Sequence, residues 1–333
     1  MFTHCYTASQ VKQMLGGRLR RKGRKYIMNL NEATKLLTSL NMTSRNITHI
    51  KGSFDKDIFL IDDKYILRPS TNSMDDQIEC FKRISHLDSV PKIIKTGVFE
   101  DELKNNYIIL TQIPGVEYFT QIQKLNTIEN EKLGLSIASF LDNLHLNTST
   151  VYDIGHYVPI IKGFTGIWRD GHEKYWDYLS SNIDGLNLSL NSRNVIKEAF
   201  SFLNAHLDSL SYQAGPVLLH NDFHPKNIIL FNKTFSGVID WECSQYGEAD
   251  FDLCHLFHWC IFPVTKEYSF NKVLQTVLQS SKCNTVPDLY KRITIYEIEH
   301  ELIQLIWSNG TAEVDRINKI ERWINNEVEL FVK

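Results

Sequence analysis

The residues between 218 and 242 carry polar groups of the kind that phosphoryl transfer requires. The stretch reads LLHNDFHPKNIILFNKTFSGVIDWE. Asp222 lies two residues after His220, Asn227 lies five residues further on, and Asp240 ends the apolar run GVID. Amide and carboxylate oxygens are hard ligands that suit Mg²⁺. Asn227 and Asp240 on adjacent strand ends can hold metal between the β- and γ-phosphates of a nucleotide, while Asp222 reaches toward an acceptor hydroxyl.

Protein kinases share this order of residues, His-x-Asp-x-x-x-x-Asn followed by a metal-binding aspartate. Two features disfavour a protein kinase here. Asp240 is followed by Trp241-Glu242 instead of Phe-Gly, and only eleven residues separate it from Asp252, with no Ala-Pro-Glu afterwards. An activation segment that docks a polypeptide therefore has no room. A P-loop enzyme is excluded because the chain has no GxxxxGK[ST] motif.

The stretch more closely resembles the aminoglycoside-phosphotransferase and choline-kinase superfamily. In that superfamily the loop reads His-x-Asp-x-x-x-x-Asn and the metal motif reads Ile-Asp-Trp or Ile-Asp-Phe. The following residues YGEADFDLCHLFHW are similar to its Gly-(Asp/Glu)-x-x-x-Asp-Leu stretch. The resemblance implies that Asp222 is the catalytic base, that Asn227 and Asp240 bind two Mg²⁺ ions, and that His220 and Asp252 support the loop.

The same resemblance implies a nucleotide site in the N-terminal part. The run KGSFDKDIFLIDDKYILR resembles the family's phosphate loop and the strands that follow it, which would bring Gly52 and Ser53 close to the phosphates. Arg68 takes the place of the phosphate-binding cation, with Glu79 on the next helix as its expected partner. Residues 110–115, LTQIPG, resemble the hinge, where the backbone of Gln112 and Ile113 would bind the base. ATP and GTP both remain possible, since these contacts are made by the main chain.

The hydrophobic pattern predicts which elements position these residues. Before residue 114 it predicts a short helix at NLNEATKLLTSL, a turn at Asp62-Asp63, a helix capped by Ser73, and strands at 47–51, 57–61, 64–68 and NNYIILTQI. Later segments have helical periodicity, at 128–146, 192–210, about 288–307 and 313–331. We therefore expect an α+β, bilobal protein-kinase-like fold, with a small antiparallel β-rich N-lobe at 28–113 and a larger, mostly helical C-lobe at 114–333.

Charge and composition restrict the class of partner. Residues 1–27 contain seven Lys/Arg and no Asp/Glu, and we interpret them as a disordered basic extension. Residues 117–333 contain eighteen basic and twenty-seven acidic residues, a balance that disfavours nucleic-acid binding and would attract a cationic small molecule. The chain has no apolar run long enough to span a membrane and no apolar secretory segment at its start, so we expect a cytoplasmic monomer or dimer.

The acceptor is the least determined part of this interpretation. Carboxylates and tryptophans of the C-terminal part could line a pocket for ammonium groups; the candidates are Trp168, Asp170, Glu173, Trp176, Glu297, Glu301 and Trp307. An aminoglycoside-type antibiotic is favoured, which would make the chain a resistance enzyme. Choline, ethanolamine, homoserine, sugars and macrolides remain alternatives. A nucleotide-binding regulator without catalysis is a further alternative, although such a protein would usually have lost one of the three central polar residues.

Overall fold

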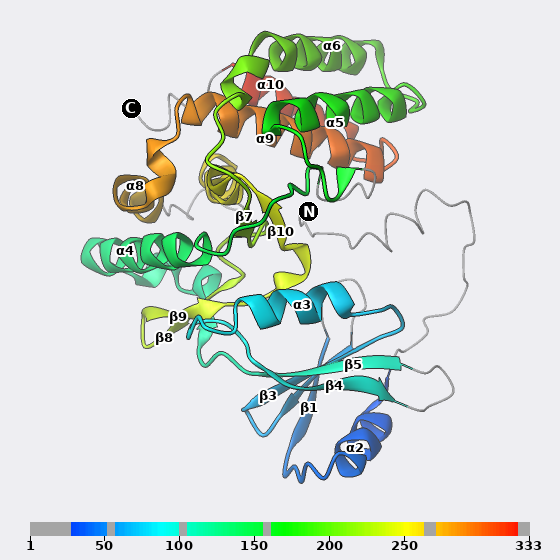
Figure 1. Ribbon diagram of the computed structural model, residues 1–333, viewed down its shortest axis with the longest axis vertical. Coiled ribbons are helices and arrows are strands. Elements are labelled where there is room, and N and C mark those ends of the chain that lie inside the picture. The colour runs from blue at the N-terminus through cyan, green and yellow to red at the C-terminus, as the bar shows by residue number, and fades with distance from the viewer. Residues whose placement is uncertain (1–27, 52–56, 100–104, 156–160, 263–270, 326–333) are drawn as a thin grey trace.

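The computed structural model of the chain describes residues 28–51, 57–99, 105–155, 161–262 and 271–325. These residues form a small lobe based on an antiparallel sheet and a larger helical lobe, which confirms the predicted fold class (Figure 1). The predicted extension 1–27 and the predicted phosphate-loop residues Gly52 and Ser53 lie outside the described residues.

The N-lobe is based on a five-stranded sheet with the strand order β1-β2-β3-β5-β4. From β1 to β5 the strands span Ile47–Lys51, Asp57–Ile61, Tyr65–Ser70, Ile93–Phe99 and Asn105–Thr111. The predicted turn between β2 and β3 is present: Asp62 and Asp63 have φ of 52° and 51°, and the N–H of Lys64 donates to the carbonyl of Ile61 at 3.0 Å. Aspartate tolerates this left-handed backbone better than most residues, so the local sequence specifies the hairpin.

Two helices cover the N-lobe sheet. Helix α2, Leu30–Ser39, begins with a capping box between Asn29 and Glu32. Its apolar residues pack with Phe59 and Ile109 of the sheet. Helix α3, Asp75–Arg83, packs with the core that contains the neighbouring residue Ile108. Because side chains alternate along β5, consecutive residues supply the two cores. The predicted cap Ser73 lies two residues before α3, where its hydroxyl accepts from the N–H of Asp75 at 3.2 Å.

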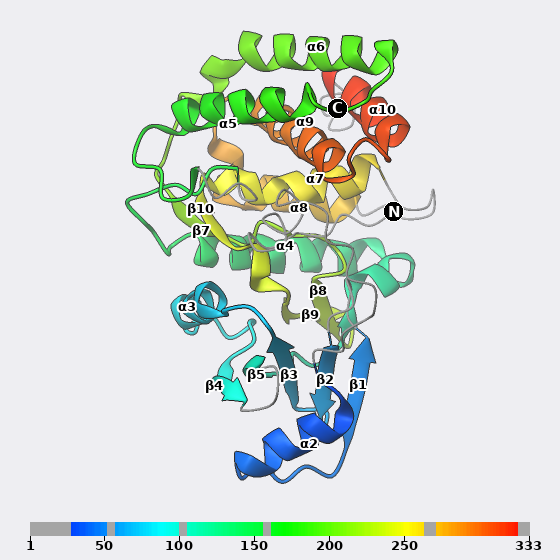
Figure 2. The same cartoon turned by 90° about the vertical axis from the view of Figure 1, so that its right-hand side faces the viewer.

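The C-lobe is mostly helical. From α4 to α10 its helices span Thr127–Leu144, Trp168–Ile183, Leu190–Ala205, Cys254–Ile261, Asn271–Ser280, Leu289–Trp307 and Glu313–Ile324. Helices α5, α6, α9 and α10 lie at the end far from the N-lobe, whereas α4 lies near the strands that approach it (Figures 1 and 2). Within the described ranges, none of the helices combines the length and apolar character needed to cross a membrane.

Two small sheets of the C-lobe hold the loops of interest. Strand β7, Val217–Leu219, pairs with β10, Gln245–Gly247. Strand β8, Ile228–Phe231, lies between β6, Val116–Glu117, and β9, Thr234–Val238. The loop 220–227 therefore connects β7 to β8, and residue 240 follows β9. This arrangement brings the two ends of the polar stretch 218–242 together.

Two glycines allow close backbone contacts near the boundary of the lobes. Gly115 has φ of +128°, and a Cβ atom there would lie 2.2 Å from the carbonyl oxygen of Leu230. At Gly237 a Cβ atom would lie 2.4 Å from the carbonyl oxygen of Ser89, which accepts from the N–H of Val238 at 2.9 Å. Only glycine avoids both contacts. At Gly237 it lets the backbones of the two lobes approach directly, and at Gly115 it lets the chain that follows the N-lobe lie against β8.

Candidate active site

Asp252 holds the loop that carries Asp222. Its carboxylate accepts from the N–H of His220 at 3.1 Å and from the N–H of Asn221 at 2.7 Å. The side chain of His145, at the end of α4, lies 3.0 Å from the same carboxylate. Asn221 itself has φ of 59°, a conformation that asparagine tolerates. The carboxylate thus fixes the backbone just before Asp222, which is the place that we predicted for Asp252.

Asn227 is bonded directly to Asp222. Its Nδ2 donates to the backbone carbonyl of Asp222 at 2.9 Å and to the carboxylate Oδ2 at 3.0 Å. Both residues are buried. Because the amide nitrogen faces Asp222, the amide oxygen is left as the atom that could bind a cation.

His220 connects this loop to the segment that carries Asp240. Its Nδ1 accepts from the N–H of Asp222 at 3.2 Å, and its Nε2 donates to the carbonyl of Ile239 at 2.9 Å. One ring nitrogen accepts while the other donates, so the imidazole is neutral. Burial also lowers the pKa of His220, against the nearby Asp252 and Asp222. The N–H of Ile239 donates to the carbonyl of Asn227 at 2.9 Å, so Asp240 directly follows a residue bonded to both His220 and Asn227.

Asp240 lies at the boundary with the N-lobe. Its backbone is left-handed, with φ of 64°, and its side chain is 41% exposed. Arg68 on β3 places Nη2 3.9 Å from the Asp240 carboxylate. The predicted residues Asp222, Asn227, Asp240 and Arg68 are therefore brought to one region.

The predicted partner of Arg68 is wrong. Arg68 forms an ion pair with Glu242, two residues after Asp240. Glu79 is 55% exposed and pairs instead with Arg83, one helical turn further along α3, at 3.1 Å. Residues four apart on a helix are natural partners, and Glu242 reaches Arg68 because the 3₁₀ turn Trp241–Cys243 follows Asp240 immediately.

His224 was not predicted, although it contacts Asp222. Its Nδ1 accepts from the N–H of Lys226 at 3.2 Å, and its Nε2 lies 3.4 Å from the Asp222 carboxylate. The ring stacks on Trp259 of α7, with centroids 5.1 Å apart. The second histidine of HNDFHPKN, two residues after Asp222, was the available sequence signal.

Asp222 is ionised over the whole physiological range of pH. Burial acts to raise its pKa, but the adjacent His224 outweighs burial and moves the pKa below its usual range. A carboxylate of such low basicity is suited to accept a hydrogen bond and orient a hydroxyl, and less suited to remove a proton early.

One of the hinge groups predicted to contact the base is already hydrogen-bonded within the protein. The N–H of Gln112 donates to the carbonyl of Lys64 at 2.8 Å, which continues the pairing of β3 with β5. That N–H is therefore not available to a base. The Gln112 carbonyl and the Ile113 N–H are the hinge groups that could serve this purpose.

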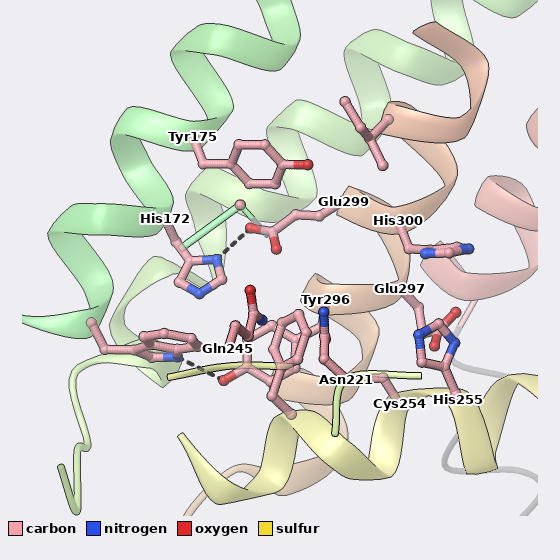
Figure 3. A pocket seen from close by; sticks show the side chains of 14 residues that line it. His172, Tyr175, Asn221, Gln245, Cys254, His255, Tyr296, Glu297, Glu299 and His300 are labelled. Carbon is pink, nitrogen blue, oxygen red and sulfur yellow. Dashed lines mark hydrogen bonds and ion pairs between the residues drawn. The ribbon is translucent and has the colours of Figure 1, made fainter. Parts of the chain in front are cut away.

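A cavity of about 30 Å³ lies beneath the loop 220–227, between α5, α7 and α9 (Figure 3). Its lining includes Asn221, Trp168, Tyr296, Glu297 and Glu299. A space of this size holds one or two water molecules. The polar lining residues come from five different segments, which is why sequence reasoning found only two of them.

The predicted acceptor residues divide into two groups. Trp168 and Glu297 line the cavity. Asp170 and Glu173 do not: Asp170 pairs with Arg169, and Glu173 lies on the exposed face of α5. Glu301 is not among the lining residues of this cavity and pairs with Arg316 of α10. Helical periodicity gives the buried face of α5 but not which carboxylates reach a pocket.

Comparisons with known proteins agree with this fold. The model of the phosphotransferase enzyme family matches residues 46–268. Aminoglycoside phosphotransferase APH(4)-Ia has a TM-score of 0.65 at 17% identity, covering 89% of this chain and 99% of that chain. The streptomycin–ATP complex of APH(2″)-IIa has a TM-score of 0.62 at 17% identity, with coverages of 89% and 96%. The GDP complex of aminoglycoside 2′-phosphotransferase-IIIa has a TM-score of 0.64 at 13% identity, with coverages of 91% and 100%. No curated protein sequence matches the chain.

These similarities define a class of fold, that of two-lobed, kinase-like phosphotransferases. Identities this low establish the fold alone. The family model, however, covers more than half of the 333 residues. The chain belongs to the phosphotransferase enzyme family.

Proposed function

We propose that this chain transfers the γ-phosphoryl group of ATP or GTP to a hydroxyl of a small molecule. The observation that carries the proposal is the bonded set formed by Asp222, Asn227 and the Ile239–Asp240 segment at the boundary of the lobes. Arg68 of the N-lobe approaches the same place. Phosphoryl transfer depends mainly on positioning and on neutralising charge, and this arrangement supplies groups for both.

Asn227 and Asp240 fit the Mg²⁺ ions that such a reaction uses. The Asn227 amide nitrogen is engaged by Asp222, which leaves its oxygen as a ligand, and the Asp240 carboxylate is 41% exposed. Both are oxygen ligands of the type Mg²⁺ prefers. When bound, the metal would supply positive charge to the phosphate oxygens.

The side chains and backbone of the protein would orient the acceptor hydroxyl, the phosphates and the base. Asp222 accepts a hydrogen bond from the acceptor hydroxyl and aligns it for in-line attack. His224 and Asn227 keep the Asp222 carboxylate in place. Arg68 orients the phosphates next to Asp240. The Gln112 carbonyl and the Ile113 N–H bind the edge of the base.

An aminoglycoside-type antibiotic is the proposed acceptor. Structurally similar proteins bind streptomycin, gentamicin or hygromycin B. The C-terminal part of this chain carries twenty-seven acidic and eighteen basic residues between 117 and 333, which favours a cation. The cavity is too small for a multi-ring antibiotic, so such a substrate would lie above it, on the side of Asp222. Resistance and a cytoplasmic location follow as parts of this proposal.

A small amino alcohol such as choline is the second candidate. The aromatic rings of Trp168, Tyr175 and Tyr296 and the carboxylates of Glu297 and Glu299 border the cavity, which would have to widen to admit such a cation. Aromatic faces and carboxylates together attract small organic cations.

A turnover screen distinguishes these possibilities. Nucleotide consumption is measured with ATP and GTP, with and without Mg²⁺, over aminoglycosides, macrolides, choline, ethanolamine, homoserine and sugars. We expect Mg²⁺-dependent consumption that rises with one acceptor class, and mass analysis of the product to locate the phosphate. Tight nucleotide binding without turnover of any acceptor would instead indicate a regulator.

A further inference from the structure

A second buried polar cluster lies in the C-lobe, where α7, α9 and α10 meet. His258 of α7 faces Glu297 and Glu301 of α9. Glu297 and Glu301 are four residues apart and so project from the same side of their helix. The side chains of the three residues are 6%, 0% and 0% exposed. Carboxylates are rarely buried to this extent without full compensation.

The three side chains are placed as ligands of one ion would be. His258 Nδ1 lies 2.7 Å from Glu297 Oε2 and 3.7 Å from Glu301 Oε1. One ligand atom from each residue can be chosen so that all three lie within 4.8 Å of one another. Atoms that bind a tetrahedral metal at about 2.1 Å lie about 3.4 Å apart, so only small movements separate this geometry from a bound state.

The cluster also has buried polar atoms that the protein does not satisfy. Within the described residues, Glu297 Oε1 and Glu301 Oε1 have no hydrogen-bond partner, and neither does the adjacent His300 Nε2. The ring of His300 lies 5.7 Å from that of His258. Figure 3 shows His300 beside Glu297. A buried carboxylate oxygen without a hydrogen bond lowers the stability of the fold. A ligand bound to these oxygens would remove that cost.

Charge is compensated unevenly in this cluster. Arg316 lies 2.7 Å from Oε2 of Glu301, and Lys319 lies 4.0 Å from Oε1 of the same carboxylate. Glu297 forms an ion pair with His258 and, within the described residues, none with a lysine or arginine. A cation bound between His258 and the two glutamates would place a positive charge next to Glu297 and compensate its carboxylate.

We propose that His258, Glu297 and Glu301 bind a divalent first-row transition-metal ion of the Zn²⁺ type. An imidazole nitrogen with two carboxylates suits such ions, whereas Mg²⁺ prefers oxygen ligands only. The bound ion joins α7 to α9 and stabilises the C-lobe. The site is separate from the Mg²⁺ ligands Asn227 and Asp240, and it does not depend on the proposed phosphoryl transfer.

Metal content measured on the full chain tests the proposal. The protein is stripped with EDTA, given Zn²⁺ in the presence of excess Mg²⁺, desalted, and analysed for bound zinc by mass spectrometry. We expect one zinc per chain and a higher melting temperature than that of the stripped protein, because a ligand that binds only the folded state stabilises it. A chain that retains no zinc under these conditions overturns the proposal.

Two matched variants identify the ligands. Glu297→Gln removes one proposed ligand. Glu299→Gln is the control, because Glu299 lies on the same helix and forms an equally buried pair with His172 at 2.7 Å, without a third ligand. We expect Glu297→Gln to lose the bound zinc and the zinc-dependent shift in melting temperature, and Glu299→Gln to keep both.

Equal zinc in both variants and the parent would mean binding elsewhere and would overturn the assignment. If Glu297→Gln does not fold, His258→Asn takes its place with the same expected loss. Co²⁺ provides a spectroscopic check: its visible absorption reports direct coordination and should vanish with the same variants.

Discussion

The loop around Asp222 and the cluster around Glu297 are both buried and polar, yet the protein satisfies them to different degrees. In the loop, Asp252 receives two backbone N–H groups and His145, and both ring nitrogens of His220 are used. In the cluster, one oxygen of Glu297 and one of Glu301 have no hydrogen-bond partner within the described residues. A network whose hydrogen bonds are all formed fixes the geometry of its residues. A network with unused acceptors favours the binding of a ligand, here the proposed metal ion.

The comparison has direct consequences for substitution. Removing a member of the completed network leaves several buried groups unpaired at once. Removing a member of the incomplete network leaves fewer, because part of its hydrogen-bonding capacity is already unused. The following experiments run from the largest expected effect to the smallest.

Asp222→Asn should lower kcat by about a thousandfold, because the amide is a much poorer acceptor for the substrate hydroxyl. The variant keeps the size of the side chain, so the fold should be retained. Steady-state kinetics on the acceptor found by the screen measure the effect. Asp184→Asn, at an exposed position after α5, is the control. Near-normal turnover in Asp222→Asn would remove Asp222 from its proposed role.

Asp252→Ala should lower the free energy of unfolding by about 3 kcal/mol, since it leaves two backbone N–H groups and His145 without their acceptor. Urea denaturation measures the change. Asp208, which is 94% exposed, provides the control Asp208→Ala with little expected effect. Equal stabilities of the two variants would show that the loop does not depend on this carboxylate.

The pairing of His145 with Asp252 should make stability depend on pH. Burial alone would lower the pKa of His145, but its contacts with Asp252 and Cys283 raise it to about 10. A raised folded-state pKa gives stability that is complete below the unfolded value, about 6.5, and is lost as the pH rises to about 10. We expect the stability advantage over His145→Gln to shrink by about 1–3 kcal/mol between pH 7 and pH 10. An advantage independent of pH would contradict the charged pair.

Glu297→Gln should have the smallest effect when metal is absent, within about 1 kcal/mol, because the amide oxygen can still accept from His258 and the lost oxygen had no partner. Urea denaturation in EDTA tests this. A loss of several kcal/mol would show that the charge of Glu297 is compensated by the protein, and the contrast between the two regions would disappear.

Much of the fold could be predicted because local patterns specify it. The alternation of apolar residues predicted the strands, and the pair Asp62-Asp63 predicted the turn between β2 and β3. The loop from His220 to Asn227 is also short and local, so its internal contacts follow from spacing. Asp252 was identified through the family resemblance, and its hydrogen bonds to the loop agree with that expectation.

The parts that could not be predicted depend on how distant segments pack. Arg68 could reach Glu79 or Glu242 as far as the sequence shows, and only the 3₁₀ turn after Asp240 decides between them. Gln112 has its N–H occupied because β5 extends one residue further in its pairing with Lys64. The side chains that line the cavity come from α5, α7, α9, the loop 220–227, strand β10 and the 3₁₀ turn Ala249–Leu253, and no local pattern relates them.

The hydrogen bond from Val238 to Ser89 has a mechanical consequence. It attaches the N-lobe segment before β4 to the chain two residues ahead of Asp240, with Gly237 allowing direct backbone contact. A rigid rotation moves atoms least near its fixed point. If the lobes swing about this attachment, their outer edges move furthest while Asp240 stays almost still. A substrate could then enter and leave without displacing the carboxylate that we propose as a metal ligand.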